Sequence, residues 1–406
     1  MNYPRRSRKL SNMPSKKIVP VLAGLGIYLL TTGISYAAFT AAAKPGSYLS
    51  PLGNGSSQPA DNANRKLLAD VSGNKTEACP LNGSRHTKIE KSLWEARRPL
   101  AVMIENHQEA RPQSGLSDAD IVYEAVAEGG ITRFMAVYYC QAAAYETIVG
   151  PVRSARTYFL DWASEYSFPL YTHVGGANTP GPANALGQIE SYGWAGANDL
   201  NQFSIGYPTF WRDYERLGHT VATEHTMYST TKKLWDVGAN RGFTNLDPEK
   251  QSWTTEFTPW KFAKNETGSA NQSGSQTVSY PYWEDETYAV SWQYDPAAKV
   301  YKRTNGGAEH KDLNTGEQLS AVNVVVQLTT EKKANDGYPG NLHLLYATVG
   351  KGKALIFMNG QATEGTWAKS KRTGRTLFYD SKGKEIVFNP GKIWISVLPS
   401  DTKVSY

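Results

Sequence analysis

The most informative stretch of this sequence is residues 120–139, DIVYEAVAEGGITRFMAVYY. It contains two runs rich in β-branched and aromatic residues, each of strand length, on either side of a glycine pair. Glycines supply the positive φ angles that a tight hairpin turn needs, so we expect two antiparallel strands here. A helix over 117–128 is the alternative, because Ser117 and Asp120 imitate a capping box, but the β-branched density favours strands.

The segments around this hairpin alternate between strand and helix patterns. Apolar runs of strand length occupy 99–106 and 169–174, and apolar residues at helical spacing occur over 153–166, 182–192 and 230–237. Such alternation is typical of a mixed sheet flanked by helices. We therefore predict an α/β (α+β) N-terminal domain over residues 92–245.

The last part of the chain follows a different pattern. From residue 277 to 404 the apolar runs are short, and turn sequences such as the Asn-Gly pairs at 305–306 and 359–360 separate them. This spacing predicts a β-rich C-terminal domain, either a barrel or a sandwich. The polar segment 246–276 between the two domains is predicted to be an inter-domain linker.

The N-terminal 44 residues combine a basic segment with an apolar one. Residues 1–17 carry six basic and no acidic side chains, and residues 18–43 carry no charged side chain at all. About 20 apolar residues span a bilayer, and a basic flank stays in the cytoplasm, so the chain after Lys44 is predicted to lie outside the cell membrane. The segment 1–44 is either an uncleaved anchor or a signal peptide whose removal gives a secreted protein. Residues 45–91 are predicted to be a polar linker.

Composition and charge exclude several classes of protein. With 406 residues the chain can hold two or three domains, and its 11 Trp and 24 Tyr residues exclude a mostly disordered protein. The net charge of +6 comes from the N-terminal segment, because the rest of the chain carries 37 basic and 37 acidic residues. Nucleic acid is therefore not an expected partner.

The cysteine count fits an extracytoplasmic protein. Cys79 and Cys140 are the two cysteines of the chain, and their spacing has no metal-binding pattern. Outside the cytoplasm they can form one disulfide bond, and two separately buried thiols are the alternative.

Several short motifs make this chain similar to a known family. They are RPQSGL at 111–116, ADIVYE at 119–124, EGGITR at 128–133, GPVRSAR at 150–156 and NPGKIW at 389–394. Together they resemble the bacterial YerB-like family, whose two parts are the N- and C-terminal halves of the domain of unknown function 3048. The resemblance implies a membrane-attached, extracytoplasmic two-domain protein with no assigned activity. Many members look like lipoproteins, whereas this chain has no lipobox cysteine after its apolar segment.

Charged side chains gather at the strand ends of the predicted N-terminal domain. In an open α/β sheet ligands bind beyond strand ends, and arginine side chains can fork onto phosphate or carboxylate groups. We therefore predict an Arg-rich cleft for an anionic or glycan ligand of the cell envelope. Its candidate residues are Glu105, Asn106, Arg111, Arg133, Arg153, Ser154, Arg156, His173 and His225.

Two acidic residues near this set are candidates for a metal site. Asp118 and Asp120 could hold a divalent cation such as Mg²⁺. The alternative is that the arginines form ion-pair networks with nearby acids and bind nothing. The acids in question are Asp118, Asp120, Glu124 and Glu128. The catalytic residues are unknown, because the sequence contains no nucleophile elbow, P-loop, HExxH or dinucleotide fingerprint.

A local pattern also resembles the LytR–CpsA–Psr phosphotransferases, which attach glycopolymers to bacterial cell walls. It comprises a strand, Arg111, the run GLSDAD at 115–120, a hairpin and Arg133 at its far end. This resemblance implies an enzyme acting on lipid-linked glycopolymers. The residues corresponding to its pyrophosphate-binding arginines and metal-binding acid would be Arg111, Asp118, Asp120, Arg133, Arg153 and Arg156.

Two non-enzymatic functions remain as alternatives. Aromatic residues near turns could stack on the sugar rings of a cell-wall glycan. These residues are Tyr192, Trp194, Tyr207, Phe210, Trp211 and Tyr214. A structural or assembly protein of the envelope, without ligand chemistry, is the other alternative.

Overall fold

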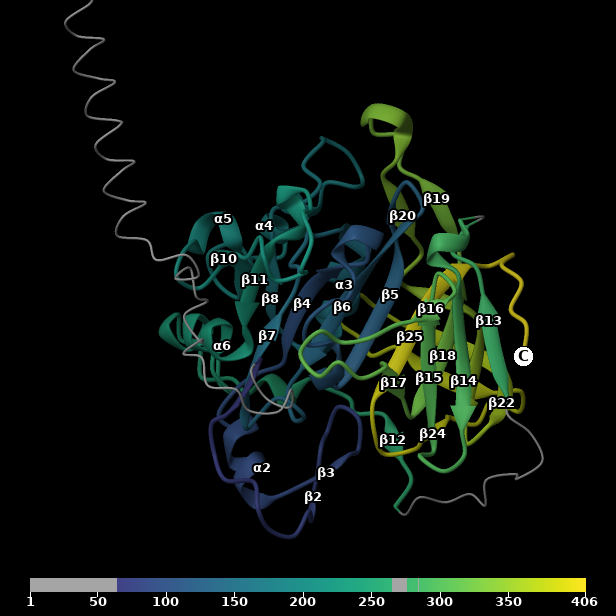
Figure 1. Cartoon of the computed structure of the whole chain (residues 1–406), viewed down its shortest axis with the longest axis horizontal. Helices are drawn as coiled ribbons and strands as arrows, with labels where there is room; N and C mark the ends of the chain where they lie inside the picture. The colour runs from purple at the N-terminus through teal and green to yellow at the C-terminus, as the bar shows by residue number, and fades with distance from the viewer. Residues whose placement is uncertain (1–63, 265–275, 284) are drawn as a thin grey trace, which may run out of the picture. The chain divides into compact units, whose positions relative to one another are not determined.

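Figure 1 shows a computed structural model of the chain, which describes residues 64–264, 276–283 and 285–406. The predicted signal peptide or membrane anchor over 1–44 lies outside these residues. Among the helices of the described part, none has the length and apolar character needed to cross a membrane.

A ten-stranded sheet is the centre of the fold and has the order β23-β22-β21-β18-β25-β5-β6-β4-β8-β9. Five strands precede residue 246: β4 (Leu100–Glu105), β5 (Ile121–Glu128), β6 (Ile131–Tyr138), β8 (Leu170–His173) and β9 (Asp199–Asn201). The other five follow residue 276: β18 (Asn323–Thr329), β21 (Gly350–Met358), β22 (Gln361–Lys369), β23 (Leu377–Asp380) and β25 (Ile393–Pro399). Strand β25 runs parallel to both β5 and β18, so the two parts of the chain share one sheet (Figure 1).

The predicted hairpin is confirmed as β5 and β6, which pair antiparallel. Gly129 and Gly130 form its turn with φ angles of 58° and 83°, as the sequence requires. Both strands are central in the sheet and almost completely buried. A strand covered on both faces needs apolar residues in nearly every position, which explains the continuous apolar runs.

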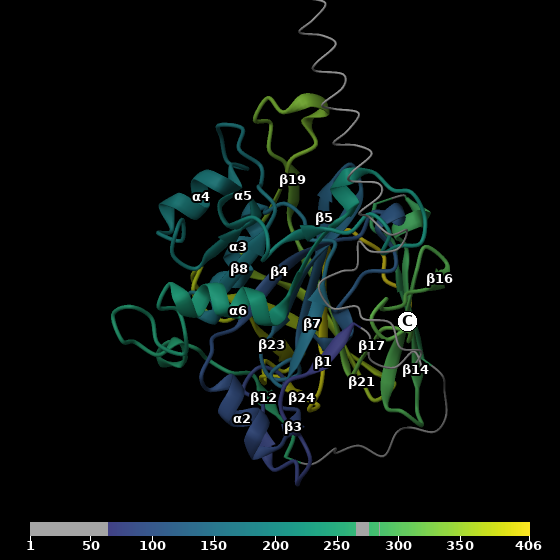
Figure 2. The same ribbon diagram turned by 60° about the vertical axis from the view of Figure 1, so that its left-hand side comes forward.

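Helices cover both faces of the N-terminal part of the sheet. Trp162 of α3 (Thr157–Ala163) stacks on Tyr123 of β5 at 5.9 Å. On the other face, Gly238 of α6 (Thr231–Asn240) lies so close to Leu170 that a Cβ atom would come within 2.5 Å of its side chain. Strand pairing places Leu170 on the same face of the sheet as Val122. Because successive residues of a strand point to opposite faces, Tyr123 lies on the other face, so α3 and α6 cover opposite faces. Figure 2 shows α6 crossing this part of the sheet.

On the face of the large sheet that α6 covers, a second sheet packs on the C-terminal part. Its strands are β13 (Thr277–Tyr280), β14 (Val290–Asp295), β15 (Val300–Asn305), β16 (Ala308–Glu309) and β17 (Ser320–Ala321). Trp292 of β14 packs edge to face on Trp394 of β25, with ring centroids 5.3 Å apart. The C-terminal part is therefore β-rich, as predicted, and the fold is mixed α/β.

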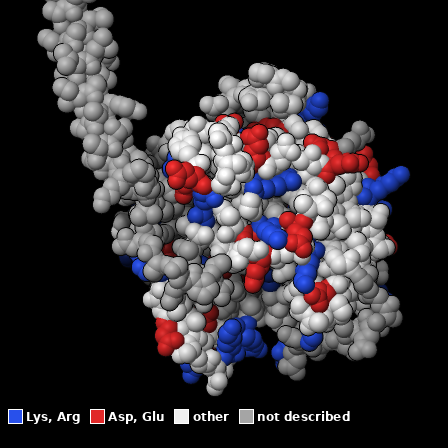
Figure 3. Space-filling view, in the orientation of Figure 1, with Lys and Arg blue, Asp and Glu red and all other residues white. Residues whose placement is uncertain are grey.

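Smaller elements complete the described fold. They are β7 (Tyr145–Val149), α4 (Ala185–Ser191), α5 (Gln202–Ile205), β10 (Trp211–Arg212), β11 (Met227–Thr230), β19 (Glu331–Lys333) and β20 (Leu344–Tyr346). Figure 3 shows basic and acidic side chains interspersed on the face in view. This mixture agrees with the equal numbers of acids and bases after residue 17.

The segments predicted as linkers contribute to the fold where the structure describes them. From residue 64 on, the first segment forms β1 (Arg65–Leu67), β2 (Glu77–Ala78), β3 (Arg85–His86) and the start of α2 (Lys88–Trp94), and β1 pairs with β7. In the second segment, Trp253 and Trp260 are buried, and β12 (Lys261–Phe262) pairs with β24 (Val387–Phe388). Only a few apolar residues pack these segments onto the fold. Because polar residues separate them, the sequence shows no strand or helix pattern there.

Candidate functional site

A cavity of about 640 Å³ lies beyond the carboxyl ends of β4, β8 and β9. These three strands run parallel, so their carboxyl ends meet at one edge of the sheet. The segment 152–155 crosses this edge and is fixed by its backbone, because the Arg153 amide donates to Met103 O at 2.9 Å and Arg153 O accepts from the Val174 amide at 3.0 Å. The lining includes Arg153, Ser154, Gly175, Gly176, Asn201, Phe203, Arg212 and Glu224.

Arg153 lines this cavity and has free donors. Its Nε atom donates to Glu105 Oε1 at 3.0 Å, and its side chain is 27% exposed. Its two terminal nitrogens have no hydrogen bond to any residue of the described part of the chain. A guanidinium group held by one nitrogen, with the other two free, is suited to bind a phosphate or carboxylate.

An exposed aromatic ring borders the same cavity. Phe203 is 75% exposed, and its ring lies against Gly175. Gly175 has a φ angle of 57°, and a Cβ atom there would lie 3.0 Å from a ring carbon of Phe203. Glycine at position 175 therefore allows the positive φ angle of the turn and leaves space for the Phe203 ring. The cavity combines a planar apolar surface with an anion-binding group, which is the chemistry that a charged sugar needs.

Glu105, the ion-pair partner of Arg153, is almost fully buried. Its second oxygen lies 2.8 Å from His225 Nδ1. Burial alone would raise the pKa of Glu105, but the hydrogen bond from His225 and the charge of Arg153 outweigh it and lower the pKa. The bond to Glu105 in turn raises the pKa of His225, against the effect of burial.

Arg133 and Arg156 are buried and are not among the residues that line the cavity. Both pair with Glu128, and Arg133 also donates to the carbonyl oxygen of Ser154 at 2.9 Å. Burial lowers the pKa of both guanidinium groups. For these two arginines the structure shows the ion-pair network that the sequence left as the alternative. Ser154 itself lines the cavity.

Asn106 and Arg111 join the N-terminal part to the C-terminal part. Arg111 donates to Asn106 Oδ1 at 3.1 Å and to the carbonyl oxygen of Thr287 at 3.0 Å. Asn305 of β15 donates to the same Asn106 oxygen at 3.0 Å. Burial lowers the pKa of Arg111 to about 10. These contacts give both residues a role in packing between the two halves.

His173 shapes the cavity without lining it. It is fully buried, and its ring nitrogens lie 2.6 Å from Gly175 O and 2.6 Å from Asp199 Oδ1. The imidazole therefore holds the glycine turn that follows β8.

The structure does not bring Asp118 and Asp120 to the arginines. In the hairpin, Ile121 pairs with Val137 and Ala125 pairs with Arg133, and four residues of strand correspond to roughly 13 Å. The two acids precede Ile121 and hence lie at the opposite end. Both carboxylates are buried among protein donors, which makes the predicted Mg²⁺ role unnecessary to explain their positions.

Asp120 holds the turn that contains Cys140. Its carboxylate accepts hydrogen bonds from the amides of Tyr139, Cys140 and Gln141 at 2.7 to 3.1 Å. It also accepts one from Asn82 Nδ2 at 3.0 Å. Burial raises the pKa of Asp120 to about 6, although these bonds and the charge of His86 oppose the shift. At the neighbouring Asp118, burial also raises the pKa, and Arg65 and Thr147 donate to Oδ2.

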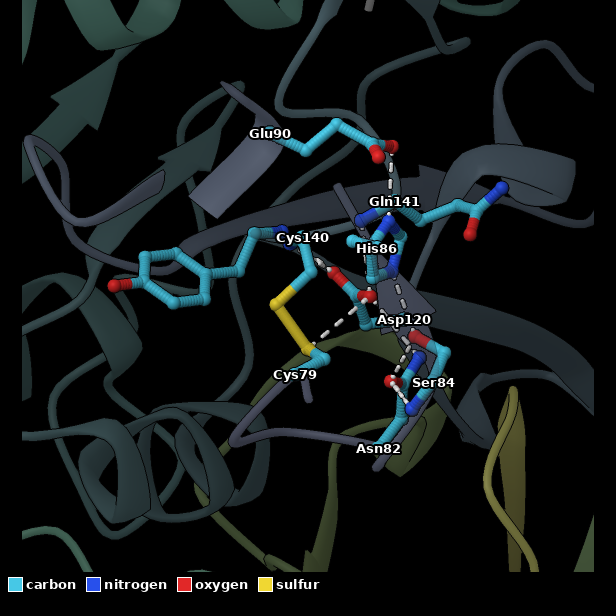
Figure 4. Close-up of a disulfide and its surroundings, with 9 residues drawn as sticks. Cys79, Asn82, Ser84, His86, Glu90, Asp120, Cys140 and Gln141 are labelled. Atoms are coloured by element: carbon cyan, nitrogen blue, oxygen red, sulfur yellow. Dashed lines mark hydrogen bonds and ion pairs between the residues drawn. A yellow bond between two sulfur atoms is a disulfide. The ribbon is translucent and has the colours of Figure 1, made fainter. Parts of the chain in front are cut away.

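The structure joins Cys79 and Cys140 in a disulfide, with Cα atoms 5.9 Å apart (Figure 4). Beside it, Ser84 Oγ lies 2.8 Å from His86 Nε2, and His86 Nδ1 lies 2.9 Å from Glu90. The hydrogen-bonded series Ser84, His86 and Glu90 has the order of the nucleophile, base and acid in a catalytic triad. However, Ser84 Oγ also lies 2.7 Å from Asn82 Oδ1, which can only accept, so the hydroxyl hydrogen points to Asn82. The arrangement therefore fixes the segment around the disulfide.

The aromatic residues predicted to stack on sugars divide into two groups. Trp194, Phe210 and Trp211 are buried, whereas Tyr207 and Tyr214 are 78% and 53% exposed. Tyr192 is partly buried and bonds to Asp161. Phe203 was not among the predicted residues, and the available signal was a lone aromatic residue between polar ones directly after β9, in α5.

A second cavity, of about 760 Å³, lies between α3, α4 and β20. Asp161 lines it, but its carboxylate already accepts bonds from Gln188, Tyr192 and Thr348. Lys332 is the basic residue of its lining. None of the predicted arginines lines it, so the Arg153 cavity is the stronger candidate.

Comparison with known proteins places this arrangement in a family. The model of the N-terminal domain of the protein of unknown function DUF3048 matches residues 85–244, and the model of its C-terminal domain matches residues 278–395. This chain belongs to the DUF3048 family. The two matched domains correspond to the two parts of the shared sheet.

One curated family relative is "Putative lipoprotein YerB" of Bacillus subtilis strain 168. It is 33% identical over 321 residues, which are 79% of this chain and 86% of the relative. The crystal structure of the YerB protein from Bacillus subtilis is also similar, with a TM-score of 0.64 and 28% identity. That match covers 82% of this chain and 100% of the solved chain.

Proposed function

We propose that this protein is an extracytoplasmic protein of the bacterial envelope that binds an anionic sugar ligand in the cavity of Arg153 and Phe203. The observation that carries the proposal is that the free guanidinium fork of Arg153 and the exposed ring of Phe203 belong to the lining of one cavity. The fork supplies the contact to a phosphate or carboxylate, and the ring supplies a stacking surface for the sugar.

The proposed location rests on three independent features. The apolar segment 18–43 with its basic flank is suited to membrane targeting. A relative carries the word lipoprotein in its name. The disulfide between Cys79 and Cys140 is typical of proteins outside the cytoplasm. Attachment would use the N-terminal segment as an anchor, or the protein would be released after cleavage.

The phosphotransferase alternative has weaker support. The acids that the resemblance assigns to the metal, Asp118 and Asp120, lie at the other end of the hairpin from Arg133. This alternative also needs several arginines in one cleft, but Arg133 and Arg156 are buried and pair with Glu128. A scaffold without a ligand remains the alternative that the binding experiment below would favour if no sugar binds.

The test is isothermal titration of the full chain with glucose phosphate, glucose and inorganic phosphate. We expect glucose phosphate to bind most tightly, because only this ligand uses both the fork and the ring. Arg153→Met should weaken its binding about ten- to hundredfold, the range for a lost hydrogen bond to a charged group. Phe203→Ala should weaken glucose phosphate more than inorganic phosphate.

The control is Arg85→Met, because Arg85 is an exposed arginine that donates to Thr76 O, away from the cavity. This variant should bind like the wild type. Equal binding of glucose and glucose phosphate would contradict an anion site. Loss of binding in Arg85→Met as large as in Arg153→Met would show that the effect is one of overall charge.

A further inference from the structure

We propose that His107, Glu109 and His225 form a binding site for a divalent transition-metal ion of the Zn²⁺ type. Their candidate ligand atoms all lie within 4.8 Å of one another. Glu109 Oε2 and His225 Nε2 are 3.6 Å apart, which is close to the separation of two atoms bound to one tetrahedral ion. None of the acids predicted from the sequence to bind a metal takes part.

Two short helical turns bring these residues together from distant parts of the chain. His107 and Glu109 follow β4, at the start of the 3₁₀ helix η2 (Gln108–Ala110). His225 ends the 3₁₀ helix η5 (Thr223–His225). The imidazole rings of His107 and His225 are 4.7 Å apart and nearly parallel, at 11°. Backbone hydrogen bonds close both turns, from the Ala110 amide to His107 O and from the His225 amide to Ala222 O, each at 2.9 Å.

Glu105 orients the central ligand of this cluster. His225 Nδ1 lies 2.8 Å from Glu105 Oε2, and a carboxylate at this position keeps the hydrogen on Nδ1. Nε2 then keeps its lone pair, with Glu109 Oε2 3.6 Å away. Metal-binding histidines almost always donate their second ring nitrogen to a carboxylate or carbonyl in this way. The arrangement is therefore a second observation, independent of the distances, that favours a metal.

The two other ligands are free to adjust. Glu109 is about half exposed, with a side-chain exposure of 51%. His107 is partly exposed, and its ring is held by one long hydrogen bond, 3.3 Å from the Glu109 amide to Nδ1. To bind an ion together with the buried His225, the His107 ring has to turn out of its stack on His225. The exposed Glu109 carboxylate then completes the set of three ligands.

The donor types select the metal. Two imidazole nitrogens and one carboxylate oxygen suit Zn²⁺ and similar ions, whereas Mg²⁺ prefers oxygen donors and keeps several waters. Three protein ligands also leave one position of a tetrahedral ion open to water or a ligand. Glu105 connects this cluster to Arg153 but is not itself one of the three ligands.

The experiment measures Zn²⁺ and Mg²⁺ binding to the full chain by isothermal titration after chelator treatment. We expect one Zn²⁺ per chain, with millimolar Mg²⁺ unable to compete. His107→Ala and Glu109→Gln should each weaken Zn²⁺ binding at least tenfold, and both residues are exposed enough for the fold to tolerate the change. Glu105→Gln should weaken it by about ten- to a hundredfold as an orienting residue.

The matched control is His219→Ala, which removes an exposed histidine that contacts Leu217 O instead. It should bind Zn²⁺ as the wild type does. Absence of Zn²⁺ binding in the wild type would overturn the proposal, and so would equal affinity of His107→Ala and the wild type. The readout is metal binding alone, so failure here would leave the sugar-binding proposal to its own titration.

Discussion

Replacement of Arg303 by Met should strongly destabilise the protein, because Arg303 and Glu124 form a buried ion pair across the two halves of the fold. Both side chains are fully buried, and Arg303 Nη2 lies 2.9 Å from Glu124 Oε2. Trp394 covers the guanidinium carbon at 4.6 Å from its ring. Glu124 lies on β5 and Arg303 on β15, so the pair ties the central sheet to the second sheet.

The magnitude follows from what remains after the substitution. Glu124 would keep hydrogen bonds from Thr132 at 3.0 Å and Trp394 at 3.2 Å, but no cation. His310 would lose the Arg303 Nε donor at 2.9 Å. In the wild type, burial and the charges of Arg303 and Arg111 hold the pKa of His310 well below its usual range, so this ring adds no second cation beside Glu124. An unpaired buried charge costs about 3–5 kcal/mol, a large share of the roughly 5–15 kcal/mol that stabilises a typical protein.

The assay is urea unfolding followed by tryptophan fluorescence and far-UV circular dichroism. Lys302→Met is the matched control, because the adjacent Lys302 forms a surface pair with Asp295 and should cost less than about 1 kcal/mol. The double variant Arg303→Met with Glu124→Leu should recover much of the loss, since it leaves no charge unpaired. If Arg303→Met costs as little as Lys302→Met, the reasoning is refuted.

Three further predictions concern the disulfide, a buried lysine and the membrane topology. Cys79 and Cys140 are 61 residues apart, so Cys79→Ser with Cys140→Ser should lower the unfolding free energy by about 4 kcal/mol; an unchanged urea midpoint would contradict this. Burial lowers the pKa of Lys392 to about 8, below the unfolded value, so the folded state loses its proton first and the unfolding free energy should rise between pH 8 and 10.5, by up to about 3 kcal/mol. This rise should be missing in Lys392→Met when both are unfolded in urea across that range. A reporter that works only outside the cytoplasm, fused after Tyr406, should be active, and activity of a cytoplasmic reporter there would reject the predicted topology.

Local patterns in the sequence were sufficient for the hairpin and for three helices of the N-terminal part. The β-branched runs and the glycine pair identified β5 and β6, and helical spacing identified α3, α4 and α6. The shared sheet could not be predicted, because β25 inserts between β5 and β18 and pairs Ile393 with Ile121, far apart in the chain. The spacing of apolar residues within one segment carries no information about such a long-range pairing.

The candidate site was predicted in part. The rule that ligands bind beyond strand ends pointed to this edge of the sheet, and two of the residues it selected, Arg153 and Ser154, line the cavity. The rule could not separate Arg153 from Arg156, because both pair with an acid and only the fold shows that Arg156 is buried. The sequence also could not decide the role of Asp120. A carboxylate before a strand can bind a metal or stabilise a turn, and here it accepts hydrogen bonds from three backbone amides.

The most direct test of the anion cavity is a ¹H–¹⁵N NMR titration of the full chain in detergent with glucose phosphate. The account predicts saturable shifts of the amide signals of Gly175, Gly176 and Ser154, which line the cavity, and their loss in Arg153→Met. Saturable shifts confined to residues around Asp161 and Tyr346 in the second cavity, or shifts at Gly175 that persist unchanged in Arg153→Met, would contradict it.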